Sequence, residues 1–323
     1  MAILSTIFSA LLPLVVTFVL GFVAAWRHDF GSKDASTLNR MVLQYAVPLA
    51  LFAGTVMTSR AALSRDIPLV ITLCVAIIGS YCGVFLFSRL VLHMQVSRSA
   101  LAALTASAPA VPFVGPAVLG DLFGGLSAIP IAIASLVINL TVVPVTILLL
   151  ALDTAGRDSQ RTCLAARDKS HLALPAAKLA ETLKQPIVWA PVLAFMVVLS
   201  GLHIPRLIVH SLSLLGNASG GVALFASGIV LASGKIKANS QVWLLVFLKN
   251  ILQPALVLGG LRWVGYGEPI VSEAVLTAAI PTMPIVIMFA LQYRVAQAEA
   301  ASAVFLSVMG SIVTMGIFIA LTH

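Results

Sequence analysis

Apolar blocks of about 20 residues recur along almost the whole chain, separated by short polar segments. As an α-helix, a block of this length spans a hydrocarbon core of roughly 30 Å. The chain is 60% hydrophobic and 9% charged, with a mean hydropathy of +1.08, whereas a soluble domain of this size carries far more charge. The sequence therefore predicts an all-α integral membrane protein in a lipid bilayer.

Ten blocks are expected to be transmembrane helices, at residues 2–26, 41–58, 68–92, 100–120, 129–152, 187–203, 207–233, 241–264, 269–293 and 299–321. No Lys or Arg precedes the first block, which is therefore expected to be a retained helix rather than a secretory signal. The longest polar stretch divides the chain into three predicted parts: a first five-helix repeat at 1–152, a basic cytoplasmic loop at 153–186 and a second repeat at 187–323.

Lys and Arg are distributed unequally between the loops on the two sides of the predicted spans. Fourteen fall on one side and four on the other, while Lys249 lies inside a block. The positive-inside rule places the rich side in the cytoplasm, so both termini are expected to be periplasmic. Because membrane orientation accounts for the net charge of +8, the basic residues indicate no nucleic-acid partner.

A proline motif recurs in the two halves of the chain. Residues 105–114 read TASAPAVPFV and residues 277–286, which are 172 positions later, read TAAIPTMPIV. A second match pairs ALFA at 50–53 with ALFA at 223–226. With five spans in each copy, the second copy enters the membrane from the opposite side. The sequence thus predicts a 5+5 inverted repeat, an architecture found in many secondary transporters.

Both proline pairs fall in the middle of a predicted span. Proline lacks an N–H and clashes with the carbonyl four residues earlier, so crossed, discontinuous helices are expected, with a simple kink as the alternative. The N-terminus of a half-helix carries partial positive charge and free N–H groups that suit a carboxylate. The candidate substrate-binding residues at these breaks are Pro109, Pro112, Gly115, Pro281, Thr282 and Pro284.

Polar residues inside the eighth span provide further candidates for substrate binding: Lys249, Asn250 and Gln253. Lys249 and Gln253 are four residues apart and share a helix face. Charged groups inside a bilayer are costly and are often functional, so Lys249 is expected to attract a carboxylate. The alternative is a lysine whose ammonium group reaches the cytoplasmic surface along its own stem.

Amides occur inside two other predicted spans. Asn139 shares a face of the fifth span with Ser135 and is a further candidate for the same cavity. Asn217 and Ser219 lie in a glycine-rich stretch of the seventh span and are expected to pack against neighbouring helices.

Acidic residues are missing from the middle of every predicted span, and Asp121 and Glu273 lie near span ends. Buried carboxylates commonly bind a coupling proton or hold Na⁺, so a coupling ion, H⁺ or Na⁺, stays possible beside an uncoupled carrier. The chain has no catalytic Ser/His/Asp pattern, metal-ligand spacing or phosphate loop within its spans. We therefore expect no enzyme activity, no catalytic residues, no metal and no other cofactor.

The run AAIPTMPIVIMFALQY at 278–293 resembles the second crossover of the auxin efflux carrier family, with Ile285, Val286, Phe289, Ala290 and Tyr293 in the matching places. The resemblance implies a ten-helix fold of the sodium/proton-antiporter type. Spans one, two, six and seven would form a scaffold, often a homodimer interface, and the other six would form a moving bundle. Bacterial members are permeases for small carboxylates such as malonate, and plant members export auxin.

The chain departs from the plant members at the breaks, where they commonly carry an asparagine. Ser107, Ala108, Ala279 and Ile280 precede the prolines here. The resulting expectation is a secondary transporter that moves a small organic anion, first a dicarboxylate such as malonate, across the bacterial inner membrane by alternating access, with symport as one form of coupling. The alternatives are a carrier of a bulkier monoanion, auxin-like or bile-acid-like, and a membrane sensor or channel.

Overall fold

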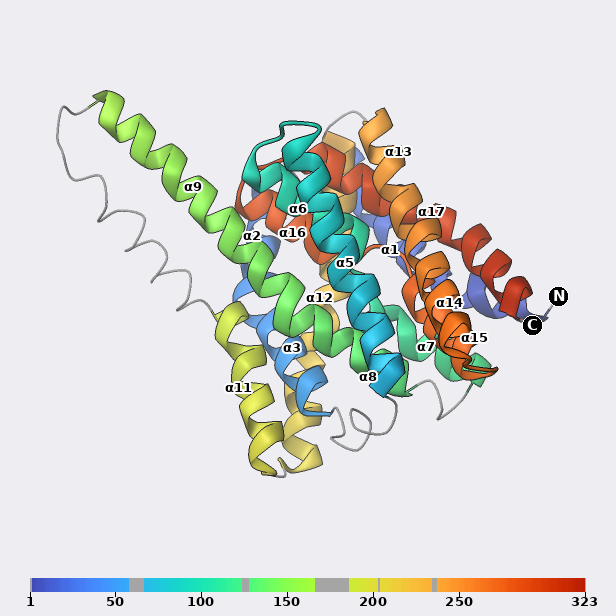
Figure 1. Cartoon of the computed structure of the whole chain (residues 1–323). Helices are drawn as coiled ribbons and strands as arrows, with labels where there is room; N and C mark the ends of the chain where they lie inside the picture. The colour runs from blue at the N-terminus through green and yellow to red at the C-terminus, as the bar shows by residue number, and fades with distance from the viewer. Residues whose placement is uncertain are drawn as a thin grey trace.

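The computed structural model describes residues 2–57, 67–123, 128–165, 186–202, 204–233 and 237–322, and within these ranges the chain forms helices and no strands (Figure 1). Five helices are long and apolar enough to cross a membrane: Ile67–Leu90, Ile129–Thr154, Arg206–Ala232, Ser240–Val264 and Gln297–Thr322. Shorter apolar helices cover Leu11–Trp26, Pro186–Ser200 and Ile270–Ala279. These helices confirm the prediction of an all-helical membrane protein.

The helices follow the apolar blocks with two differences. The helix of the fifth block continues to Ala165, into the loop predicted at 153–186, and the helix of the second block begins at Ser32 instead of residue 41. In the first half they are α1 (Ala2–Trp26), α2 (Ser32–Met41), η1 (Val42–Ala46), α3 (Val47–Val56), α5 (Ile67–Leu90), α6 (Val96–Ser107), α7 (Val111–Phe123), α8 (Ala128–Val137), η3 (Ile138–Val142) and α9 (Val143–Ala165). In the second half they are α11 (Pro186–Ser200), α12 (Arg206–Ser233), α13 (Ser240–Phe247), η4 (Leu248–Leu252), α14 (Gln253–Val264), α15 (Ile270–Ala279), α16 (Ile285–Gln292) and α17 (Gln297–Thr322). Helix α9 projects beyond its neighbours (Figure 1); the last part of the predicted loop, from residue 166, lies outside the described residues until residue 186.

One group of helices, here called the scaffold, consists of α1, α2, η1, α3, α11 and α12. Helix α1 packs along α12, and α3 packs against both α11 and α12. Glycine allows α1 and α12 to approach closely. A Cβ atom at Gly228 would lie 2.2 Å from the carbonyl oxygen of Phe18, and one at Gly21 would lie 2.0 Å from that of Phe225. The two backbones are therefore in direct contact.

The remaining helices form a second group, here called the bundle. Helix α5 packs against α6 and α14, α6 against α9, and α15 against α14 and α17. Every residue of α15 from Val271 to Ala279 is buried, so this helix lies at the centre of the bundle. A helix that is enclosed on all sides is expected to have a uniformly apolar sequence. Helix α15 departs from this pattern at Ser272, Glu273 and Thr277.

The bundle contains both predicted helix interruptions. Helix α6 ends at Ser107 before α7 begins, and α15 ends at Ala279 before α16 begins. The two extended segments between these half-helices lie antiparallel and pair with each other. The Ala110 N–H donates to the Pro281 carbonyl at 2.8 Å, and the Met283 N–H donates to the Ala108 carbonyl at 2.9 Å. Backbone groups freed by the breaks are thus satisfied inside the protein, as membrane depth requires. We call this pairing the crossover.

Three five-residue π-helical turns interrupt otherwise continuous helices at η1, η3 and η4. In each, the residue after the turn donates its N–H to a carbonyl five residues earlier, for example Val47 to Val42. The next residue is always a proline: Pro48, Pro144 and Pro254. Because proline clashes with the carbonyl four residues back, a wider turn accommodates the ring without ending the helix. The sequence-based spans did not predict these turns.

Candidate functional site

Two side chains of the eighth predicted span donate hydrogen bonds to the backbone of the crossover. The Lys249 Nζ donates to the carbonyls of Ala278 and Ile280, both at 2.7 Å, and its side chain is 0% exposed. One turn further, the Gln253 Nε2 donates to the Ser107 carbonyl at 2.8 Å. These carbonyls lie at the C-terminal ends of α15 and α6, where helix dipoles concentrate negative charge. Lys249 and Gln253 therefore cap the two half-helices that enter the crossover.

A second set of buried hydrogen bonds ties the crossover to α17. Asn250 Nδ2 donates to the Ser307 carbonyl and Ser307 Oγ donates to Asn250 Oδ1, both at 2.8 Å. The Thr282 N–H donates to Ser307 Oγ at 3.0 Å, and Thr282 Oγ1 donates to the Thr105 carbonyl at 2.9 Å. With these bonds the broken backbone is fixed on both of its sides, so the crossover is a rigid part of the bundle.

A cavity of about 460 Å³ lies between the scaffold and the bundle. The scaffold lines it with η1, α3 and α12, and the bundle lines it with α7, α8, η3 and the segment that leads into α16. The lining runs from the middle of the helices toward the loops that carry few Lys and Arg: residues 42–57, from η1 to the end of α3, 112–120 of α7, 131–139 of α8 and η3, and the central residues 213–223 of α12. Its volume is that of an ordinary small-molecule site.

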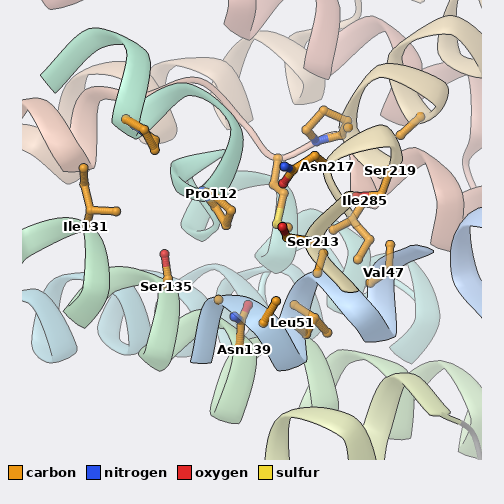
Figure 2. Close-up of a pocket in the computed structure, with 18 of the residues that line it drawn as sticks. Val47, Leu51, Pro112, Ile131, Ser135, Asn139, Ser213, Asn217, Ser219 and Ile285 are labelled. Carbon is orange, nitrogen blue, oxygen red and sulfur yellow. The ribbon is translucent and has the colours of Figure 1, made fainter. Parts of the chain in front are cut away.

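Most of the wall is apolar, and the polar groups come from two opposite sides. Ser135 and Asn139 lie on the α8–η3 side, and Asn217 and Ser219 lie on the α12 side (Figure 2). Asn139 is 1% exposed and its Oδ1 has no hydrogen-bond partner. A buried acceptor without a donor is costly, so an N–H or O–H group of a ligand in the cavity would satisfy this oxygen, whereas a carboxylate, itself an acceptor, would not.

Two half-helices begin at this cavity. Pro112, the second residue of α7, lines it, and so do Pro284 and Ile285 at the start of α16. The N-terminus of an α-helix carries partial positive charge. At α16 the Val286 and Ile287 N–H groups are bound to the Met283 and Pro284 carbonyls, at 3.3 and 3.0 Å, so the contribution of this helix is its dipole. Within the described lining no side chain is charged. The positive potential here therefore comes from backbone rather than from Lys or Arg, an arrangement that suits an anionic group.

The structure divides the candidate residues into three groups. Pro112, Asn139 and Pro284 line the cavity. The crossover and its supports contain Pro109, Lys249, Asn250, Gln253, Pro281 and Thr282. Gly115 packs α7 on α8, since a Cβ there would lie 3.2 Å from Ile131 Cγ1. The proposed contact of Lys249 with substrate stays a prediction, and its observed contacts favour a capping role.

Several cavity residues escaped the sequence analysis. Asn217 and Ser219 were expected to pack helices, but both line the cavity with Ser213. The glycine-rich stretch does pack: a Cβ at Gly216 would lie 2.9 Å from Ala50 Cα. Helix α12 therefore uses one side for packing and presents an adjacent side to the cavity. The sequence signal that could have indicated a cavity residue here was a polar residue, Asn217, next to a packing glycine, Gly216.

Comparison with known proteins places this arrangement in a family. A family described as "Membrane transport protein" matches residues 6–319. The chain belongs to this family. It is the family of the auxin efflux carriers, so the resemblance found at residues 278–293 is confirmed.

Similar proteins of this family are found in enteric bacteria. The uncharacterized transporter YfdV of Escherichia coli strain K12 is 31% identical over 316 residues, which cover 96% of this chain and 95% of that protein. The proteins of the same name from Escherichia coli O157:H7 and Shigella flexneri match to the same extent. The family and these relatives are transporters, which makes this chain a multi-pass membrane transport protein and not an enzyme.

Proposed function

We propose that this transporter carries a small organic anion across the bacterial cytoplasmic membrane by alternating access. The observation that carries the proposal is the cavity between scaffold and bundle, where α7 and α16 begin and where no described lining side chain is charged. Helix N-termini supply positive potential for a carboxylate. A binding site between two separately packed groups of helices can be exposed to either side when one group moves against the other.

A ten-span, inverted arrangement supports this proposal. The five interrupted helices can be read as single crossings, three with a π turn and two with a crossover break inside, which gives five crossings before residue 166 and five after residue 185. The α6 and α15 breaks lie 172 residues apart, at the offset of the sequence repeat. The start of α1 and the end of α17 are drawn at the same side of the molecule (Figure 1), as an even number of crossings requires.

The cavity runs from the middle of the helices toward the loops poor in Lys and Arg. The positive-inside rule assigns these loops to the periplasm. Toward the other end, the rings of Phe18 on α1 and Phe305 on α17 have centroids 4.9 Å apart, and α16 packs against α2 and α12. Scaffold and bundle also pack together beside the cavity, through α1 with α7 and α3 with α8. We infer from the position of the cavity that the structure is in an outward-facing state.

The cavity wall favours the second of the two substrate classes considered. A dicarboxylate such as malonate brings two charges, and burying a charge without a partner is strongly unfavourable. The wall instead combines one polar zone with apolar side chains such as Leu51, Met283 and Met288. An anion with one carboxylate and an apolar body, auxin-like in character, matches this division better than malonate does.

This preference is testable by ligand-induced stabilisation of the purified protein. Phenylacetate is expected to raise the midpoint of thermal unfolding, because a ligand that binds only the folded state stabilises it by mass action. Malonate is expected to do so more weakly, and the neutral isostere phenylacetamide is expected to have no effect. Equal stabilisation by phenylacetamide would contradict carboxylate recognition, and stronger stabilisation by malonate would reverse the substrate preference.

Dimerisation through the scaffold helices stays a prediction of the family resemblance. The candidate group for binding a coupling ion is a buried acid outside the cavity, Glu273.

A further inference from the structure

One carboxyl group is enclosed inside the bundle without a hydrogen-bonding partner for its Oε1. Glu273 lies one turn into the half-helix α15, is 2% exposed, and its Oε1 has no donor nearby. The residues before and after it on α15 are buried as well. The position follows from the fold: α15 is the central helix of the bundle, so even its first turn is covered by protein.

Four other described acids are bound to donors or lie near a cation. Glu299 accepts a hydrogen bond from Lys237 Nζ at 3.0 Å, Asp34 accepts one from the Gly31 N–H at 2.8 Å, and Glu268 accepts one from the Ser272 N–H at 2.9 Å. Asp29 lies 3.8 Å from Arg27. The side chain of Asp121, the other acid expected near a span end, lies outside the described ones. Among the described acids, Glu273 is the one that is both enclosed and unpartnered at an oxygen.

The elements packed against α15 offer Glu273 no described ion pair. They are α14, α17, α7, α8, η4 and α5. The titratable and charged side chains of these helices have other partners or no described ion pair. Arg262 of α14 donates to the Leu321 carbonyl, Lys249 of η4 caps the opposite end of α15, Glu299 of α17 binds Lys237, and Arg89 of α5 donates to the Met94 carbonyl. Tyr81 of α5 bonds to Thr146, and Cys74 and Cys82 are free thiols on the same helix; α7 holds Asp121, and α8 holds no titratable residue.

The N-terminal dipole of α15 favours an ionised carboxylate by only about 1 kcal/mol. Burial without a partner for Oε1 costs an ionised carboxylate more than this, so the neutral acid is favoured. We propose that Glu273 is a proton-binding site that holds a proton in this conformation, and that H⁺ is the coupling ion of the transporter. The proton reaches it from the charge-poor end: the exposed residue Pro269 is four residues away, about 6 Å along the helix. A conformation in which water or a cation contacts Glu273 stabilises the ionised carboxylate and therefore releases the proton. The proton binds better to the enclosed conformation.

Proton binding by Glu273 is tested without any substrate. Infrared spectra of the purified protein in lipid at neutral pH are expected to show the C=O stretch of a protonated carboxylic acid. The band should be lost in Glu273→Gln, which keeps the shape of the side chain, and kept in Glu268→Gln, which changes the neighbouring exposed acid. An unchanged band in Glu273→Gln, or no such band in the wild type, would overturn the proposal.

The coupling role rests on the proposed transport function and needs a second measurement. In proteoliposomes, an imposed inward proton gradient is expected to drive phenylacetate accumulation by the wild type and by Glu268→Gln above the level in protein-free liposomes, which neutral phenylacetic acid enters by diffusion. In Glu273→Gln, gradient-driven accumulation should be at least tenfold lower than in the wild type, while exchange of phenylacetate at equilibrium is kept. Accumulation driven by Na⁺ and unaffected by Glu273→Gln would overturn proton coupling. Failure of all exchange in the wild type would instead count against the transport proposal and leave the infrared result standing.

Discussion

Replacing Lys249 by methionine is expected to reduce transport per folded molecule by more than tenfold and to lower the thermal unfolding midpoint. The Lys249 Nζ is the described donor to the Ala278 and Ile280 carbonyls. Methionine leaves both oxygens buried, and each unsatisfied group costs about 1–3 kcal/mol. It also removes the positive charge at the C-terminal end of α15, where the helix dipole is negative. Uptake normalised to folded protein and a thermal melt of the same sample measure the two effects.

Two further variants separate capping from substrate contact. Lys249→Arg is expected to rescue little, because the larger planar guanidinium does not fit a fully buried site built for an ammonium. Lys33→Met, a change on the exposed surface of α2, is the matched control and should be silent. If Lys249 contacted the substrate instead, Lys249→Met would raise the KM for an anion and leave the unfolding midpoint unchanged, which would contradict the capping role.

At a pH high enough to ionise the introduced carboxyl group, replacing Asn139 by aspartate is expected to abolish binding of anionic substrates. Two like charges about 4 Å apart repel by about 4 kcal/mol at an effective dielectric constant of about 20, which corresponds to roughly a thousandfold in affinity. Asn139→Ala removes the amide without adding charge and should weaken binding by about tenfold, the worth of one hydrogen bond to a charged group. Ligand-induced stabilisation measures both variants.

Asn239→Asp is the matched control, because it makes the same chemical change at an exposed residue outside the cavity lining. Asn239 is exposed and caps α13 by accepting the Val242 N–H at 3.0 Å, and aspartate caps helices equally well. Its affinity for phenylacetate should equal that of the wild type. If Asn139→Asp also bound phenylacetate normally, the cavity would not be the anion site.

The helix breaks could be predicted from the sequence because proline acts locally. Pro109 and Pro281 interrupt their helices wherever the neighbours lie, since each lacks an N–H and clashes with the preceding turn. The prolines that follow η1, η3 and η4 show the limit of this reasoning. Their clash is relieved by a π turn instead of a break, and the choice depends on whether surrounding helices can satisfy the freed backbone groups.

The partners of the polar residues could not be predicted in the same way. Spacing placed Lys249 and Gln253 on one helix face, and both do face the crossover. The sequence did not reveal that this face meets two helix C-termini rather than the cavity, because Ala278 and Ser107 lie on other helices, far away in the chain. Asn217 was misjudged for a related reason, since its glycine-rich helix serves packing and cavity on adjacent sides.

Substrate counterflow tests the central claim most directly. Proteoliposomes loaded with unlabelled phenylacetate are diluted into a trace of labelled phenylacetate, with malonate-loaded vesicles measured in parallel. An alternating-access carrier with one site for organic anions predicts transient accumulation of label above equilibrium, absent from vesicles that contain Asn139→Asp. Label that only equilibrates, without an overshoot for either anion or for any other small carboxylate, would indicate a pore or an unrelated substrate and would contradict the account.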